Sequence, residues 1–317
     1  MREHFLALWQ QYHLPFASVG FVYPLPAVIG LMPLLLLPLP AALAAWLVFG
    51  AGGSYCAILL REHWRLLVLL PFLFMPLHRA ILVKQPALIW FALTVVLLFA
   101  MRWRWSWLVG YCIVMLPGKP QAGLLFAIVG LFWAWHQDRR SLLWTAGWGA
   151  LIWGGAWVLE PFWVSDWIAS VRYYTSVAPT PWLLPWGILL MALCCRLPWY
   201  AQVGVAQVVL FPLSDIYSAL PLLLAWVGIG GRLALAGSAC TWLWYGLGLP
   251  NEFSVFWALV IMPLAVCALV RLTPTVRKHW RSWRTRQAAL GYISSKRHTT
   301  RCGLHTQKCF NNALAFG

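Results

Sequence analysis

The run "LMPLLLLPLPAALAAWLVF", residues 31–49, has no charged residue and no alternation between apolar and polar positions. A strand of a membrane barrel alternates in this way, because one of its faces meets lipid and the other does not. A helix instead satisfies its backbone hydrogen bonds within itself, so it can be apolar all round. The run therefore predicts helical structure in an apolar surrounding.

The composition of the whole chain extends this prediction. Of its 317 residues, 62% are hydrophobic and 9% are charged, whereas soluble domains carry about 25% charged residues. Segment 26–38, interrupted by Pro33 and Pro38, is expected to form a juxtamembrane helix. We expect an all-α, polytopic transmembrane protein with about eleven membrane segments, at 41–61, 65–77, 85–101, 105–117, 121–135, 141–159, 182–195, 199–212, 216–231, 233–249 and 253–271.

Basic residues fall on alternate turns between these segments, and the positive-inside rule makes those turns cytoplasmic. The residues are Arg61, Arg65, Arg102, Arg104, Arg139, Arg140, Arg196, Arg232 and the C-terminal tail. Three regions are expected: an outer-face juxtamembrane segment 1–40, a transmembrane domain 41–271 with an outer loop 160–181, and a basic cytoplasmic tail 272–317. The polar, patternless end of the tail predicts disorder there.

The net charge of +16 does not indicate a nucleic-acid partner. Ten of the 23 lysines and arginines lie at or after Arg271, as is typical of a tail beside anionic lipid. The eight cysteines form no C-x-x-C pair, which argues against a metal site. The sequence has no nucleotide-binding or hydrolase motif at a place where the motif could function. No cofactor is therefore expected.

A lysine in "VMLPGKPQAGLLF", residues 114–126, lies on an outward turn, where positive charge is scarce. Lys119 has His78, Arg79, Lys84 and Arg172 as companions on other outward turns. A cation among apolar segments costs about 2.5–3.5 kcal/mol at the bilayer centre. An anionic phosphate headgroup is the partner that would offset this cost. The alternative is that Lys119 extends to the interface and binds nothing.

The longest outward loop, residues 159–182, carries Trp163 and Trp167 four residues apart. This spacing predicts an amphipathic helix on the outer surface. Its tryptophans could stack on a sugar or cover an acyl chain, or they could serve as interfacial anchors.

Two outward carboxylates, Asp215 and Glu252, sit at the starts of predicted segments. Each could act as a general base, which requires a carboxylate near the substrate. The alternative role for each is that of a helix cap.

Four segments together resemble glycosyltransferase family 87, the polyprenol-phosphate-mannose-dependent alpha-mannosyltransferases and their relatives. "FVYPLPAVIGLMPLLLLPLPAALAAWLVF" (21–49) is similar to a Tyr-Pro-Pro-rich segment, and "LVKQPALIW" (82–90) to a Gly-Gln turn, with Lys84 in place of the usual Gly. "LPGKPQAGLLFAIVGLFWAW" (116–135) resembles a Lys-Pro-Gln segment, and "EPFWVSDWIASVRYYTSV" (160–177) an outer-loop Pro-x-Trp…Trp pattern. The resemblance runs over residues 15–270.

This resemblance implies a GT-C-like fold and a membrane glycosyltransferase in a bacterial-type plasma membrane. Such an enzyme would transfer a hexose such as mannose from a polyprenyl-phosphate donor at the outer face. The donor phosphate would be bound by Lys119, Arg79, Gln85 and Arg172. Trp163 and Trp167 would belong to the substrate loop.

The chain departs from the family pattern at its start. The family carries its catalytic aspartate in the first outer loop, after the first transmembrane helix, but this sequence has no aspartate before Asp138. We expect that this helix and loop are absent, which leaves Glu3 and Asp215 as weak candidates for the base. Two alternatives stay open: a transporter or flippase for an amphipathic or lipid-linked anion, and a non-catalytic degenerate homologue.

Overall fold

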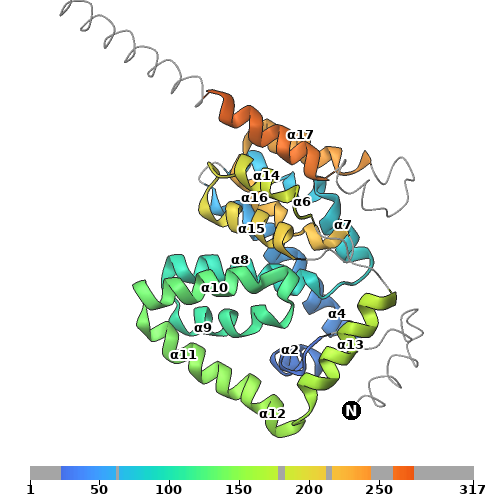
Figure 1. The fold of residues 1–317 in the computed structure, drawn as a ribbon, viewed down its shortest axis with the longest axis vertical. Coiled ribbons are helices and arrows are strands. Elements are labelled where there is room, and N and C mark those ends of the chain that lie inside the picture. The colour runs from blue at the N-terminus through green and yellow to red at the C-terminus, as the bar shows by residue number, and fades with distance from the viewer. Residues whose placement is uncertain (1–22, 62–63, 178–182, 212–215, 244–259, 275–317) are drawn as a thin grey trace, which may run out of the picture. The chain divides into compact units, whose positions relative to one another are not determined.

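The computed structural model describes residues 23–61, 64–177, 183–211, 216–243 and 260–274 (Figure 1). These residues form helices joined by short turns and include no strand. The all-α class is therefore confirmed. The chain divides into two compact units, 1–268 and 269–317. Of the second unit, the structure describes the end of the helix Met262–Pro274.

The first long helical stretch covers the predicted segment 41–61. After α2 (Leu25–Gly30) and α3 (Met32–Leu35), the chain stays helical from residue 39 to residue 60. This stretch consists of α4 (Leu39–Leu47), the π-helical η1 (Val48–Gly52), α5 (Gly53–Cys56) and the 3₁₀ segment η2 (Ala57–Leu60). Pro38, with an extended backbone, is the N-cap of α4, and Pro40 lies in its first turn, where a missing N–H costs nothing.

The single segment expected at 65–77 is wrong. The structure has three short helices there, η3 (Trp64–Leu67), α6 (Leu70–Leu73) and α7 (Met75–Leu82). Pro71 and Pro76 each lie in the first turn of a new helix, and Phe74 between them is extended. Proline cannot donate the hydrogen bond of a helix interior, so each one starts a helix instead of continuing one.

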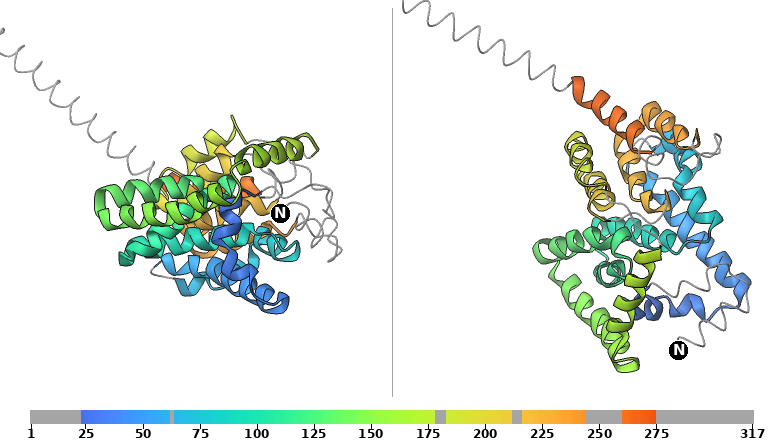
Figure 2. Two further views of the ribbon diagram at one scale, coloured as in Figure 1. Left: turned by 90° about the horizontal axis from the view of Figure 1, so that it is seen from below. Right: turned by 45° about the vertical axis from the view of Figure 1, so that its right-hand side comes forward.

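Four helices of alternating direction follow one another in the first unit and pack side by side (Figures 1 and 2). They are α8 (Ala87–Trp103), α9 (Ser106–Met115) with the 3₁₀ turn η4 (Leu116–Gly118), α10 (Pro120–Gln137), and α11 (Arg139–Gly149), which continues through the π-helical η5 (Ala150–Gly154) into α12 (Gly155–Leu159). Helices of 17 or 18 residues are about 26 Å long. The predicted segments 85–101, 105–117, 121–135 and 141–159 are confirmed as helices.

The later part of the unit reaches α10 through α15. It contains α13 (Trp163–Val177), α14 (Gly187–Leu193), α15 (Trp199–Leu210), the 3₁₀ segment η6 (Ile216–Ala219), α16 (Leu222–Ile229) and α17 (Gly231–Cys240). Helix α15 lies against both α10 and α16. A Cβ atom added at Gly204 of α15 would come within 2.5 Å of the carbonyl oxygen of Pro221, so these two backbones approach as closely as glycine allows.

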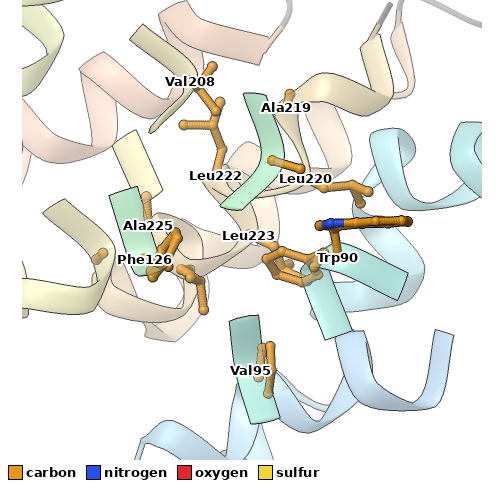
Figure 3. Packing of buried hydrophobic residues seen from close by; sticks show 14 of the residues in the cluster. Trp90, Val95, Phe126, Val208, Ala219, Leu220, Leu222, Leu223 and Ala225 are labelled. Atoms are coloured by element: carbon orange, nitrogen blue, oxygen red, sulfur yellow. The ribbon is translucent and has the colours of Figure 1, made fainter. Parts of the chain in front are cut away.

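A continuous apolar core joins these helices. Figure 3 shows part of it, with residues from α8, α10, α15, η6 and α16. Trp90, Trp226, Phe91 and Phe126 are among its largest fully buried side chains. Close packing of such side chains fixes the register of the helices, because interiors have the density of organic crystals.

The helix turns gather at two opposite ends of this unit. Gly50 faces Leu88 and Gly53 faces Ala92, so the stretch from α4 to η2 runs parallel to α8. Its far end, Arg61, therefore lies at the same end as the α8–α9 turn. Arg61 also borders Gly230, between α16 and α17. We call this the arginine end; its turns carry Arg61, Arg102, Arg104, Arg139, Arg140, Arg196 and Arg232.

Two helical stretches are long and apolar enough to cross a membrane by length and composition, Leu39–Leu60 and Arg139–Leu159. Over the 18 most apolar consecutive residues of each stretch, only 22% of the residues are buried in the first and 11% in the second. The exposed surface of the second stretch includes Leu143 and Val158, with 75% and 84% of their surface accessible. Both stretches therefore present apolar side chains outward.

Replacing Gly204 with alanine should lower the free energy of unfolding by about 1–3 kcal/mol, because the new methyl group collides with the Pro221 carbonyl. The matched control is Gly147→Ala on α11, where a Cβ meets nothing within 4 Å. That change should be neutral or stabilising by about 0.5–1 kcal/mol, because alanine is the better helix former. Thermal unfolding of the purified chain in mild detergent measures both, and equal effects would contradict the close contact of α15 and α16.

Candidate functional site

Lys119 lies in the turn between η4 and α10, at the end of the helices opposite the arginine end. It precedes Pro120, and a residue before proline is disfavoured in the helical conformation. Its φ of −136° and ψ of 84° accordingly interrupt the helix. Its carbonyl accepts hydrogen bonds from the N–H groups of Ala122 at 2.8 Å and Gly123 at 3.1 Å, which starts α10. Pro120 therefore determines both where the helix is interrupted and the backbone conformation from which the Lys119 side chain extends.

The amine of Lys119 is buried among aromatic side chains, with only 5% of the residue exposed. Nζ donates a hydrogen bond to the phenol oxygen of Tyr23 at 2.8 Å. It also lies 4.9 Å from the ring centroid of Tyr23 and 5.4 Å from that of Tyr217. Both distances allow cation–π attraction. Within the described ranges, no carboxylate pairs with this amine.

Tyr23 is held in place by the helices beneath it. Its ring stacks on Trp90 of α8, with centroids 5.5 Å apart and planes 25° apart. The indole N–H of Trp90 donates to the carbonyl of Met115 at 3.1 Å. A Cβ at Gly118 would lie 2.9 Å from Cβ of Ala27, so glycine at this position lets α2 approach the turn. The tyrosine is thus positioned by contacts far from it in sequence.

A buried glutamine fixes the first turn of α10 from the neighbouring helix. Gln207 of α15 donates to the carbonyl of Pro120 at 2.7 Å and accepts from the N–H of Leu125 at 2.8 Å. The side chain is fully buried, and both of its hydrogen bonds cross between helices. It ties α15 to the helix that begins immediately after Lys119.

Burial lowers the pKa of Lys119 from an ordinary value of 10.5 to about 7. The cause is the loss of water around the charged form. An anion beside Nζ would favour the protonated amine and raise this pKa again. The site is therefore suited to receive one negative group, with the Tyr23 hydroxyl beside it.

Arg79 is on α7 and lines a different feature, a pocket of about 290 Å³. The pocket is bounded by Met75, His78, Arg79, Ile81, Leu82 and Trp242. The His78 ring lies 5.0 Å from that of Trp242. Helix α7 also packs against η6, the segment that supplies Tyr217, although no residue of η6 lines the pocket.

The other proposed phosphate ligands do not contact Lys119. Gln85 is half-buried, and its N–H bonds the carbonyl of Ala80 at 2.9 Å, closing the end of α7. Arg172 is exposed on α13. The structure thus brings Lys119 together with two tyrosines, and it does not join Arg79, Gln85 or Arg172 to the amine.

The two tryptophans of the predicted substrate loop lie on the predicted helix, α13. Trp163 is buried, and its ring lies 5.8 Å from Trp153, 6.1 Å from Trp157 and 6.5 Å from Trp167. Trp163 therefore packs α13 onto η5 and α12 instead of presenting its face outward. Trp167 is half-buried.

The two candidate bases, Glu3 and Asp215, lie outside the described residues, as does Glu252. Among the described residues, no group of three or more histidine, cysteine, aspartate or glutamate side chains is placed to hold a metal ion.

Sequence reasoning did not single out Tyr23, Tyr217, Trp90 or Gln207. Gln207 carried a usable signal, because an amide inside an apolar span needs a buried partner. Tyr23 lies in the Tyr-Pro-Pro-rich segment of the family resemblance, which assigned it no role. Tyr217 carried no signal, since aromatic residues are common throughout this chain.

The chain matches none of the family models, curated proteins or solved structures with which it was compared.

The lowered pKa of Lys119 predicts how stability depends on pH. The folded chain releases this proton near pH 7 and the unfolded chain near pH 10.5. The unfolded state therefore binds more protons between these values, so the free energy of unfolding should rise with pH across this range, by roughly 2–5 kcal/mol.

Lys119→Met should remove this contribution, because methionine has no proton to release. Thermal unfolding in detergent at several pH values gives the free energy of unfolding of wild type and variant. In the difference between the two, the contributions of the other titrating groups cancel. A difference that does not change with pH would contradict the buried amine.

Proposed function

We propose that this chain is a polytopic integral membrane protein. The apolar side chains on the outside of Leu39–Leu60 and Arg139–Leu159 support this placement. Soluble monomers rarely expose continuous apolar surface of this extent. In lipid the same side chains carry no penalty, because hydrocarbon surrounds them.

The proposed orientation has the arginine end in the cytoplasm of a bacterial-type cell. The positive-inside rule supports this choice. Exposed tryptophans occur near both ends of the helices, with Trp103, Trp105 and Trp107 at the arginine end and Trp157 towards the other. Tryptophan is enriched at both membrane surfaces. Lys119 then belongs to the outer face of the plasma membrane.

The proposed activity is transfer of a hexose such as mannose from a polyprenyl-phosphate donor at that face. The observation that carries it is the buried Lys119 amine, held by Tyr23 and Tyr217 without a carboxylate in the described part of the chain. A phosphate that leaves the sugar gains negative charge in the transition state, and a positioned cation stabilises it. The lipid chain of such a donor would lie in the bilayer beside the helices.

The backbone at Lys84 supports the resemblance to glycosyltransferase family 87. This residue has a φ of +51°, and it ends α7 with N–H bonds from Lys84 to Ile81 and from Gln85 to Ala80. A left-handed residue at this place in a helix end is usually glycine. Glycine is also the residue that the family has at this position of its Gly-Gln turn.

Asp215 is the proposed base in preference to Glu3. It comes two positions before Tyr217 in the chain, and the Tyr217 ring faces the Lys119 amine. A carboxylate must approach the acceptor hydroxyl to remove its proton.

A transporter or flippase for a lipid-linked anion is the second candidate, and one observation favours it. Both long apolar stretches contain a π-helical segment, η1 (Val48–Gly52) and η5 (Ala150–Gly154). Interrupted helices of this kind occur at functional sites and in transporters. Movement of a labelled lipid-linked sugar across proteoliposomes, without formation of product, would favour this candidate.

Lys119→Met should weaken binding of a short-chain polyprenyl-phosphate mannose to the full chain in nanodiscs by about tenfold or more, because a charge-assisted hydrogen bond contributes about 1.5–3 kcal/mol. Lys84→Met is the matched control, because this lysine is exposed and should leave the affinity within about twofold. A scintillation-based binding assay or microscale thermophoresis gives the dissociation constants.

Equal affinity for the donor in wild type and Lys119→Met would overturn the site. With a hydroxylated acceptor present, Asp215→Asn should abolish hexose transfer while donor binding is kept. Transfer that survives this change would overturn the assignment of the base.

A further inference from the structure

A second cationic feature lies at the arginine end, on two neighbouring turns. Arg102 and Arg104 flank the α8–α9 turn, and Arg139 and Arg140 begin α11. All four side chains are exposed. Within the described ranges, none of their guanidinium groups makes a hydrogen bond or an ion pair. We call these four residues the arginine rim.

A hydrogen-bonded aspartate holds the two turns of the rim together. Asp138 accepts from the hydroxyl of Ser106 at 2.6 Å and from that of Ser141 at 2.8 Å. Its other oxygen accepts from the backbone N–H of Arg140 at 3.2 Å. Burial acts to raise the pKa of Asp138, but these hydrogen bonds and the charge of Arg140 together hold it below its ordinary value. The carboxylate also caps α11. The four guanidinium groups keep their donors available for a ligand.

The backbone of Arg104 is itself unusual. Its φ of +56° and ψ of 40° are left-handed, and N–H bonds from Arg104 to Met101 and from Trp105 to Ala100 close the end of α8. Glycine or asparagine normally takes this position. An arginine there accepts backbone strain that glycine would not have.

The rim borders an exposed apolar surface. Trp103 and Trp105 are about half exposed, with ring centroids 5.0 Å apart. Phe132 and Trp135, on the last turns of α10, are exposed as well. Cations therefore stand at the edge of a surface that suits acyl chains, beside the aromatic side chains typical of the headgroup region.

We propose that the arginine rim binds the phosphate headgroup of an anionic phospholipid in the cytoplasmic leaflet. Guanidinium groups bind phosphate through paired N–H donors, and the rim offers four such groups on two linked turns. The acyl chains of the lipid would follow the apolar surface of α10 and α11. The inference rests on the membrane placement proposed above, but not on the sugar donor, so loss of transferase activity does not affect it.

The experiment is native mass spectrometry of the full chain with an equimolar mixture of phosphatidylglycerol and phosphatidylcholine in mild detergent. Wild type should retain phosphatidylglycerol about tenfold over phosphatidylcholine, with a preference that falls as salt rises, because salt screens exposed charges. The combined variant R102Q/R104Q/R139Q/R140Q should bind both lipids equally. The matched control R196Q/R232Q removes two exposed arginines of the same end and should keep the preference.

A single substitution separates binding from folding. Arg104→Gly relieves the left-handed backbone and should raise the melting temperature in detergent by about 2 °C, while it lowers the preference for phosphatidylglycerol about threefold. A structural role for Arg104 would move both quantities down together and would overturn the assignment of this residue. Equal retention of the two lipids by wild type, or loss of the preference in R196Q/R232Q, would overturn the rim as the binding site.

Discussion

The rest of this structure depends on the apolar side chains that lie on the outside of the helices. Leu143 and Val158 present most of their surface outward, which is costly in water and free of penalty in hydrocarbon. Under the proposed membrane placement, the helices associate through close backbone contact and shape, as between Gly204 and Pro221. The two cationic features, Lys119 and the arginine rim, both lie at the ends of helices.

Lys119 follows from the same constraint. An amine placed among apolar helices loses its water, and the Tyr23 hydroxyl and two aromatic rings replace only part of it. The lowered pKa of Lys119 reflects the part of this lost hydration that the protein does not replace. An anionic ligand would complete the site, whereas the arginines of the rim at the other end are exposed. Under the two proposals, the two ends bind different phosphates, one beside the buried amine and one at the headgroup surface.

The sequence was sufficient to predict the helices whose ends are marked by proline or by basic residues. Proline after Lys119 and the basic residues after α8 bounded 85–101, 105–117 and 121–135 correctly. It failed at 65–77, where Pro71 and Pro76 were read as part of one segment although each begins a new helix. The site partners could not be found this way, because Tyr23 lies 96 residues from Lys119 and Gln207 lies 82 from Leu125. Such contacts come from helix packing, which periodicity and composition do not determine.

The most direct test of the membrane placement is cysteine labelling from one side of the cell. Single cysteines replace Lys84 or Arg104, both exposed, in a chain whose eight native cysteines have been changed to alanine. A membrane-impermeant maleimide is added to intact bacterial spheroplasts. The account predicts labelling at position 84 in intact spheroplasts and at position 104 only after the membrane is permeabilised. Equal labelling of both positions before permeabilisation would contradict it.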